Sequence, residues 1–347
     1  MLEKEDDMER EKIIILTDYL NYFYSSATRK ISTMDCQKIS DLLRSAGFDV
    51  SIMNFCEIDF RKDDYSGTYI LYTSQEDRDL KYKDFIEDIL LGLKEKGAIL
   101  IPEFKYFRSH HNKVFMEIVR EISQLEEIKN IRSRFFGTFE EFEKFGKNIS
   151  LPAVIKPASG AVSEGVSLIN ERNYKKIAKS VSFSFNLEYF IKNTVKKIIN
   201  HHRLPKSLHR NKFITQNFVN GLSGDFKVLV YGEKYYVLER KNRKNDFRAS
   251  GSGKLEFPLE VKKELLDFAE RVYSKFSLPF ISLDIAEKNG EFFLIEFQAL
   301  MFGNYTLEKS EHYFLKEDGV WSKKQEGSIL EEEFCKSVVL YIGKIKK

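Results

Sequence analysis

The chain has 347 residues, of which 42% are hydrophobic and 14% aromatic, a composition typical of a globular protein with more than one domain and not of a disordered one. Its 56 basic and 53 acidic residues nearly balance, so overall charge gives no indication of nucleic-acid binding. No apolar run approaches the about 18 residues of a membrane span, and the opening MLEKEDDMEREK lacks the apolar core of a signal peptide. We therefore expect a cytoplasmic protein with no membrane span.

The first hundred residues alternate short apolar strands with amphipathic helices. Strands separated by helices require parallel crossovers, so this region is expected to form an α/β layer. The predicted elements, in chain order, are strand 12–18, helix 36–47, strand 68–74, helix 82–97 and strand 98–104.

The rest of the chain is richer in strands joined by glycine-containing turns. One helix, at 259–276, has a single apolar stripe and is expected to face the core. The other predicted elements are helix 109–127, a strand that ends at Lys156, a helix and basic loop within 183–212, strands 213–218, 226–232 and 234–240, a strand pair around 288–290, and helix 329–345.

Cysteine and histidine usage argues against a zinc centre. The three cysteines, Cys36, Cys56 and Cys335, are odd in number and far apart, which fits buried thiols in a reducing compartment. The six histidines include two adjacent pairs, and neither pair has the i, i+4 spacing of ligands on one helix face.

The segment VIKPASGAVSEGV has a composition that suits phosphate binding. A strand ends at Lys156 and enters a loop that contains Ser159, Gly160 and Gly165. Glycines allow backbone amides to approach phosphate oxygens, and a lysine supplies a compact positive charge. The P-loop pattern is absent, because Lys-Ser or Lys-Thr does not follow the glycines. An ordinary hairpin turn with an exposed lysine is the alternative interpretation.

A second segment, FITQNFVNGLSGDFKVLVYG, has the pattern of two strands with a break between them. The break follows Gln216, Asn217, Phe218 and Val219, and Asp225 opens the next strand. Such a hinge can present main-chain groups to the edge of a base, while Asp225 could accept hydrogen bonds from ribose hydroxyls. Two strands and a loop, with Asp225 as a turn residue, are the alternative that this segment alone favours.

The third segment, SLDIAEKNGEFFLIEFQ, reads as two strands joined through Asn289-Gly290, a hairpin signal. Asp284 and Glu296 lie among apolar neighbours, where carboxylates are costly unless paired or metal-bound. Glu296 and Gln298 share a face because side chains alternate along a strand.

The position of Asp284 relative to Glu296 depends on the turn. A strict two-residue turn places these carboxylates on opposite faces, whereas a three-residue connection or one bulge places them on the same face. With Gln298, they would then form an oxygen donor set that suits Mg²⁺. Solvent-facing acids on a half-exposed hairpin are the alternative.

Together with DFRAS at 246–250, these segments resemble the ATP-grasp superfamily, most closely its RimK-type and glutathione-synthetase-type carboxylate–amine ligases. The resemblance covers about 108–340 and implies an α/β (α+β) protein with the ATP-grasp fold. It implies three parts: an N-terminal α/β pre-ATP-grasp domain at 1–107, a first ATP-grasp subdomain at 108–215 with a basic helical insertion at about 183–212, and a C-terminal subdomain at 216–347 with the magnesium site.

The resemblance also implies roles for individual residues. Lys156, with Lys113 as a partnering upstream lysine, would contact the α- and β-phosphates of ATP near the glycine loop. Arg248 is the expected catalytic residue. The other implied positions are adenine at Gln216, Asn217, Phe218 and Val219, ribose at Asp225, the γ-phosphate and acyl phosphate at Arg248, Ala249 and Ser250, and Mg²⁺ (or Mn²⁺) at Asp284, Glu296 and Gln298.

Three departures from the family pattern set this sequence apart. Gln298 stands where asparagine is common, and Lys227 replaces the arginine of the usual DxR, which exchanges a two-pronged contact for a point charge. The loop after Lys156 has fewer glycines than in many relatives. We therefore do not expect the substrates of the named ligases to transfer directly.

The implied reaction is ADP-forming: a substrate carboxylate becomes an acyl phosphate, and an amine then forms an amide with it. A small-molecule kinase and a non-catalytic ATP-binding protein are the alternatives on the same fold. The segment after the metal trio, including Asn304 and Lys309, is expected to shape the acceptor side.

A basic stretch bears on the substrate. Between Tyr189 and Gly224 there are seven Lys or Arg residues and no acidic residue. Near a catalytic cleft this field would attract a small acidic carboxylate, with an amine acceptor carried by a peptide or a sugar; a solvated basic face is an equal alternative. Nucleic acid is disfavoured, because no aromatic stacking pattern accompanies the charges. The family often forms homo-oligomers.

Overall fold

The computed structural model describes residues 10–26, 33–77, 79–160, 164–185, 187–199, 206–242 and 254–347. Two compact units divide the chain. Unit 1 consists of the described residues within Met1–His110, Gly224–Lys241 and Lys254–Lys347, and unit 2 of those within His111–Ser223 and Asn242–Gly253. Within the described ranges, no helix combines the length and the apolarity that crossing a membrane requires.

Unit 1 begins with a parallel four-stranded sheet in the order β2-β1-β3-β4, which confirms the predicted α/β layer. The amphipathic helices bury Ile39 and Leu43 of α1 and Ile86 and Leu90 of α2 in its core. The elements are β1 (Lys12–Thr17), α1 (Cys36–Ser45), β2 (Asp49–Asn54), η1 (Phe55–Glu57), β3 (Tyr69–Tyr72), α2 (Lys81–Glu95), β4 (Ile99–Ile101) and α3 (Phe104–Ser109).

The ends of the first two helices follow the local sequence. Asp35 caps α1 by accepting a hydrogen bond from the backbone N–H of Lys38 at 3.0 Å. Gly47 and Gly97, the last residues of the two predicted helix ranges, have φ values of 97° and 82°. Only glycine adopts this left-handed region readily, so each glycine ends its helix.

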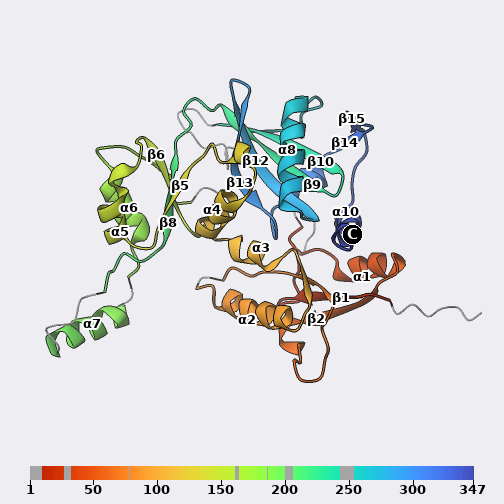
Figure 1. Cartoon of the computed structure of the whole chain (residues 1–347), viewed down its shortest axis with the longest axis horizontal. Helices are drawn as coiled ribbons and strands as arrows, with labels where there is room; N and C mark the ends of the chain where they lie inside the picture. The colour runs from red at the N-terminus through yellow and green to blue at the C-terminus, as the bar shows by residue number, and fades with distance from the viewer. Residues whose placement is uncertain are drawn as a thin grey trace, which may run out of the picture. The chain divides into compact units, whose positions relative to one another are not determined.

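The second sheet of unit 1 is antiparallel, in the order β13-β12-β9-β10-β14-β15, with β11 paired to β10 (Figure 1). Its strands and helices are β9 (Gly224–Tyr231), β10 (Lys234–Lys241), β11 (Leu255–Glu256), α8 (Lys263–Phe276), β12 (Phe280–Lys288), β13 (Glu291–Gln298), α9 (Tyr305–Lys309), β14 (Tyr313–Glu317), β15 (Val320–Lys324) and α10 (Leu330–Ile345).

Helix α8 covers one face of this sheet. Its predicted apolar stripe is buried, and Phe276 stacks on Phe297 of β13 with ring centroids 4.6 Å apart. Phe268 contacts Phe292 of the same strand at 5.6 Å. Because strand side chains alternate between faces, Asp225 and Lys227 of β9, Asp284 of β12 and Glu296 of β13 lie on the face away from α8.

Unit 2 is built on an antiparallel sheet in the order β5-β8-β6-β7, with a core of aromatic and aliphatic side chains such as Phe142, Ile155 and Phe213. Its elements are α4 (Lys113–Ile122), η2 (Glu126–Ile128), β5 (Ser133–Phe136), α5 (Phe139–Phe145), η3 (Gly146–Asn148), β6 (Ala153–Pro157), β7 (Ser167–Ile169), α6 (Tyr174–Ser182), α7 (Leu187–Ile199) and β8 (Phe213–Asn217).

The single helix predicted at 109–127 is wrong. α3 ends at Ser109, and α4 starts at Lys113 after Asn112, whose side chain accepts a hydrogen bond from the N–H of Phe115 at 3.4 Å. Asn112 therefore acts as an N-cap that begins a new helix.

Candidate functional site

Five charged residues of unit 1 share one face of the antiparallel sheet. Asp225 pairs with Arg240 across β9 and β10, Lys227 pairs with Asp284 across β9 and β12, and Asp284 pairs with Glu296 across β12 and β13. Directly opposed residues, and residues two apart on one strand, point to the same side of a sheet. The five side chains therefore converge on the face that α8 does not cover.

A register shift in the β12–β13 hairpin brings the two acids together. From the turn to Ile285 the strands keep the register of a two-residue connection, and at Asp284 the register shifts by one so that Glu296 becomes its partner. Asn289 and Gly290 form that turn with φ values of 54° and 83°. Of the two arrangements that the sequence left open, the same-face arrangement is the one observed.

Arg240 links both aspartates. Its Nε and Nη2 donate to the two carboxylate oxygens of Asp225 at 2.6 and 2.9 Å, and its Nη2 lies 2.8 Å from Oδ2 of Asp284. Lys227 Nζ lies 3.4 Å from the other oxygen of Asp284. Two largely buried acids and two largely buried bases thus balance one another in charge.

The pKa values of the two aspartates are shifted in opposite directions by their surroundings. Burial and the neighbouring charge of Asp284 raise the pKa of Asp225 to about 6. Burial alone would raise the pKa of Asp284, but the positive charges of Lys227 and Arg240 hold this pKa below its ordinary value. Asp284 therefore stays ionised well below neutral pH, as a carboxylate ligand of a cation must.

Gln298 shares the sheet face of Asp284 and Glu296. Gln298 lies two residues after Glu296 on the same face, and its Nε2 donates to Oε1 of Glu296 at 3.1 Å. With Asp284 these residues offer two carboxylates and one amide, donors that suit Mg²⁺ or Mn²⁺. Over the residues described, no group of three or more His, Cys, Asp or Glu side chains could hold a metal.

The predicted phosphate-binding residues lie in unit 2. Lys156 is 8% exposed on β6, and its backbone pairs with Ile214 of β8. Lys113 starts α4, and its Nζ donates to the carbonyl of Gly160 at 2.6 Å. The structure thus joins the upstream lysine to the loop that follows Lys156.

The loop itself shows why glycine is needed there. Gly160 has a φ of 116° and Gly165 a φ of 69°, which residues with a Cβ rarely adopt. Ser159 is exposed between the strand and Gly160.

The predicted hinge follows the central strand of unit 2. The side chain of Gln216 is buried, and its Nε2 donates to Oγ of Ser133 at 3.0 Å, so this amide is directed into the protein. Asn217 is exposed, and Phe218 and Val219 are half-buried. The residues with accessible surface are therefore those at the end of β8 and directly after it.

A buried network behind this strand was not predicted. Ser133 Oγ donates to Oε2 of Glu117 at 2.7 Å, and Oε1 of Glu117 lies 3.2 Å from Arg120. Glu117 and Arg120 have no exposed surface. Their i, i+3 spacing in the apolar stripe of α4 was the one available signal.

Other predicted positions are less informative. Arg248, Ala249 and Ser250 lie outside the described residues. Asn304 is 1% exposed; its Oδ1 accepts from the Tyr231 hydroxyl at 2.6 Å, and its Nδ2 donates to a backbone carbonyl at 2.7 Å. This amide is therefore part of the packing of the loop.

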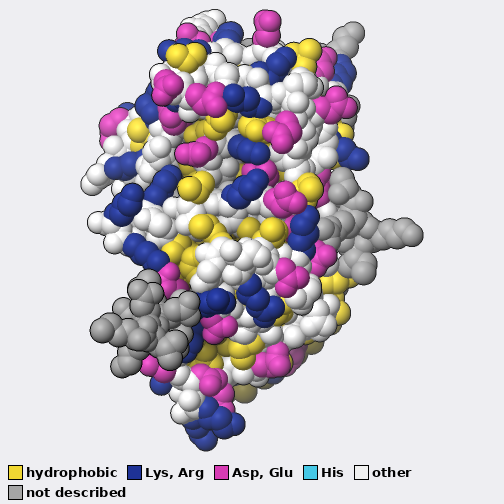
Figure 2. Space-filling model, turned by 90° about the vertical axis from the view of Figure 1, so that its right-hand side faces the viewer, with side chains coloured by type: hydrophobic (Ala, Val, Ile, Leu, Met, Phe, Trp, Pro, Cys, Tyr) yellow, Lys and Arg dark blue, Asp and Glu magenta, His cyan; other side chains and the backbone are white. Residues whose placement is uncertain are grey.

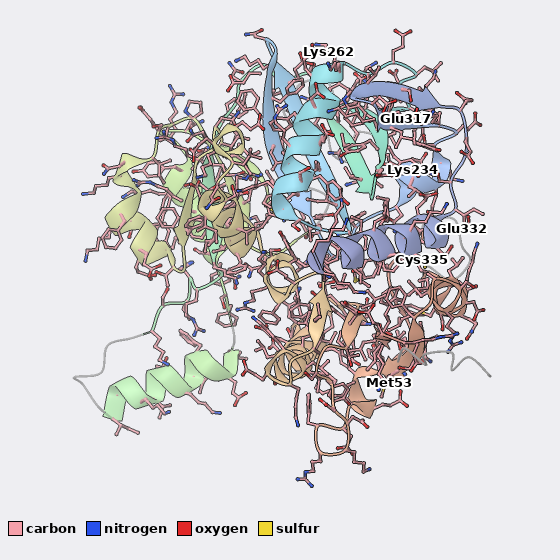
Figure 3. The ribbon with its side chains drawn as sticks, turned by 45° about the vertical axis from the view of Figure 1, so that its right-hand side comes forward. Met53, Lys234, Lys262, Glu317, Glu332 and Cys335 are labelled. Atoms are coloured by element: carbon pink, nitrogen blue, oxygen red, sulfur yellow. The ribbon has the colours of Figure 1, made fainter. Side chains whose placement is uncertain are left out.

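The cysteines have different environments. Cys335, labelled in Figure 3 on α10, is buried, whereas Cys56 is exposed, so the expectation of buried thiols is wrong for Cys56. Burial raises the pKa of Cys335 to about 12 and that of Cys36 to about 11, which keeps both thiols protonated at neutral pH.

Comparison with known proteins identifies the fold. No family model matches the chain, and no curated protein matches it. Among solved structures, D-cycloserine synthetase DcsG superposes with a TM-score of 0.53 at 11% identity, over 94% of this chain and 98% of DcsG. VanG D-Ala:D-Ser ligase from Enterococcus faecalis gives a TM-score of 0.53 at 14% identity, over 96% of this chain and all of VanG.

Proposed function

The chain has the ATP-grasp fold, and from this premise we propose that it is an ADP-forming ligase that activates a carboxylate as an acyl phosphate and joins it to an amine. The observation that carries the proposal is the pairing of Asp284 with Glu296 on one sheet face. Gln298 lies on the same face, two residues after Glu296. Carboxylates and an amide assembled this way are the donor set that ATP-grasp ligases use.

In this proposal Asp284, Glu296 and Gln298 hold Mg²⁺. A bound ion would offset the negative charge of the ATP phosphates. Lys227 and Arg240 keep Asp284 ionised, and both carry their own positive charge on the same face.

The remaining roles follow from charge and shape. Lys156 and the loop held by Lys113 would bind the phosphates of ATP, and Asn217 to Val219 would receive the adenine. Arg248 would contact the γ-phosphate. Fixed cations around oxygens that gain charge in the transition state are the main contribution of a protein to phosphoryl transfer.

The chemistry has two steps. A carboxylate oxygen of the substrate attacks the γ-phosphorus, and the bond to the β-phosphate breaks to release ADP. The amine nitrogen then attacks the acyl carbon, so that a C–N bond forms, phosphate leaves and the amine proton passes to solvent. Neither step requires a nucleophilic side chain of the protein.

The names of the similar structures guide the choice of substrates. VanG is a D-Ala:D-Ser ligase, so amino acids of both configurations are the first carboxylate and amine pools to screen. Acidic carboxylates are the second pool, because of the basic stretch between Tyr189 and Gly224.

The test is ADP release from ATP in the presence of these pools, with hydroxylamine added in a parallel series. A ligase gives ADP and a hydroxamate, because hydroxylamine traps the acyl phosphate. A kinase gives ADP and a stable phosphorylated product without hydroxamate, and this outcome would refute the ligase. Asp284→Asn and Arg248→Ala should both strongly reduce release, whereas Glu287→Gln, on the same strand as Asp284, should not.

A further inference from the structure

Helix α7 has an apolar face that other described parts of unit 2 do not cover. Figures 1 and 3 show no other helix or described strand of unit 2 packed against it. Its exposed apolar residues are Leu187, Phe190, Ile191, Val195, Ile198 and Ile199. At about 100° per residue they occupy about half of the helix circumference over a length of about 20 Å.

The apolar face continues into the segment before the helix. Phe183 and Phe185 are exposed and stack with ring centroids 6.2 Å apart, and Phe185 lies 6.1 Å from Phe190 of α7. A continuous apolar surface of this kind, left exposed by the rest of its unit, marks an interaction site.

The rest of the α7 circumference carries two exposed lysines. Lys192 and Lys196 are exposed there, and Glu188, the one acid of the helix, is paired with Lys192. Residues 187–212 contain seven Lys or Arg residues and this single acid. On the face in view in Figure 2, Lys and Arg are interspersed with Asp and Glu.

The exposed apolar face of α7 and the positive charge beside it together indicate which kind of partner binds there. A second copy of the chain would bring a stretch of the same positive charge against this one, which opposes self-association. A nucleic acid would use the cations but would leave the apolar half exposed to water. An anionic lipid surface uses both, because apolar side chains enter the acyl boundary while the lysines meet the headgroups.

We propose that α7 docks on an anionic lipid surface, with the helix lying in the plane of the interface. Binding places the apolar half-cylinder in the acyl boundary and keeps Lys192 and Lys196 at headgroup depth. This mode is distinct from a membrane span, which no described helix could form.

Flotation of the full chain with lipid vesicles tests the proposal. Vesicles of phosphatidylcholine mixed with phosphatidylglycerol should bind it about tenfold or more tightly than phosphatidylcholine alone, and added salt should weaken the binding. Ile191→Asp combined with Ile198→Asp should lower affinity by about tenfold or more, because it places two charges in the acyl boundary. Ile122→Asp, at an equally exposed isoleucine of α4, should leave binding unchanged.

A charge series separates lipid from protein partners. Lys192→Glu with Lys196→Glu should abolish the preference for anionic vesicles, whereas Lys62→Glu with Lys81→Glu, at exposed lysines of unit 1, should preserve it. Equal binding to both vesicle types, or unchanged binding by the double aspartate variant, would overturn the proposal. So would binding of polyglutamate without any binding to anionic vesicles, which would indicate an acidic protein partner. Unchanged helix content and unfolding midpoints establish that each variant is folded.

Discussion

Asp284 lies directly opposite Glu296 across β12 and β13, because the hairpin register shifts by one residue between Ile285 and Asp284. Without that shift the two carboxylates would point to opposite sides of the sheet. Two carboxylates on the same face repel each other unless a cation compensates them. Lys227 and Arg240 provide part of that compensation on the Asp284 side.

The first prediction concerns these acids as metal ligands. Asp284→Asn, and separately Glu296→Gln, should reduce ADP formation by about a hundredfold or more and raise the Mg²⁺ concentration needed for half-maximal activity, because each removes one negative oxygen donor. Initial rates over a Mg²⁺ titration, with Mn²⁺ as a second metal and a chelator to remove both, measure the effect.

Glu287→Gln is the matched control, because Glu287 lies on the same strand and pairs with Lys262. It should keep the wild-type metal titration. Full activity of Asp284→Asn at the wild-type Mg²⁺ concentration would contradict the assignment of this site.

The second prediction concerns Arg240 as the cation that holds two buried acids. Arg240→Gln leaves Asp225 without its two-pronged partner and Asp284 with Lys227 alone, and should lower the free energy of unfolding by about 3 kcal/mol. Arg240→Lys should recover only part of the loss, since an ammonium cannot make the paired contact. Urea denaturation at neutral pH measures both.

Lys241→Gln serves as the neighbouring control. Lys241 is an exposed residue that pairs with Glu256 on the surface, so its loss should leave the urea midpoint within experimental error. If Arg240→Gln were as stable as Lys241→Gln, the buried ion pairs would contribute nothing to the fold.

The third prediction is a pH dependence that originates at Glu76, in the loop between β3 and α2. Glu76 accepts hydrogen bonds from Ser74 at 2.6 Å and from the ammonium of Lys83 at 3.0 Å, and His110 Nε2 lies 3.3 Å away. Burial alone would raise the pKa of Glu76, but contacts with His110 and Lys83 hold this pKa well below its ordinary value of 4.5.

A depressed pKa in the folded state means that the unfolded chain binds more protons below pH 4.5. The stabilisation from Glu76 is therefore complete above that pH and is lost as the pH falls further. Glu76→Gln should lower the free energy of unfolding by about 2 kcal/mol at pH 7. In urea denaturation, the difference in unfolding free energy between this variant and wild type should become smaller below pH 4.5. Glu103→Gln, a half-exposed glutamate beside Lys105, should show no such gap. A gap that widened on acidification would contradict the sign.

Local periodicity was sufficient to predict much of the fold. The helices at Cys36–Ser45 and Lys81–Glu95 and the hairpin around Asn289-Gly290 follow from apolar spacing and glycine positions. The strand β2 escaped prediction because Val50 is its one fully buried residue, which leaves no alternation to detect.

The charged cluster depended on strand registers, which composition does not encode. The same-face placement of Asp284 required a register shift that no residue type signals. The position of Arg240 could have been predicted. A two-residue connection at Gly232-Glu233 pairs Arg240 with Asp225, so counting residues back from that turn would have identified the pair. The ion pair of Glu117 with Arg120 in α4 was not predicted, because charged side chains on helices are usually exposed to solvent.

The last prediction concerns the network behind the hinge strand. The hydroxyl of Ser133 accepts from Gln216 and donates to Glu117, so it joins the central strand of unit 2 to the buried ion pair of α4. Ser133→Ala leaves a buried amide and a buried carboxylate oxygen without this partner, and should lower the free energy of unfolding by about 1–3 kcal/mol.

If the strand end also receives adenine, Ser133→Ala should weaken ATP binding several-fold in nucleotide titrations, because Gln216 loses the contact that fixes its side chain. Ser133→Thr keeps the hydroxyl and should restore most of the stability and the affinity together. Recovery of stability without recovery of affinity would show that the network supports the sheet and not the nucleotide. A stable Ser133→Ala variant with wild-type affinity would show that the hydrogen bonds through Ser133 do neither.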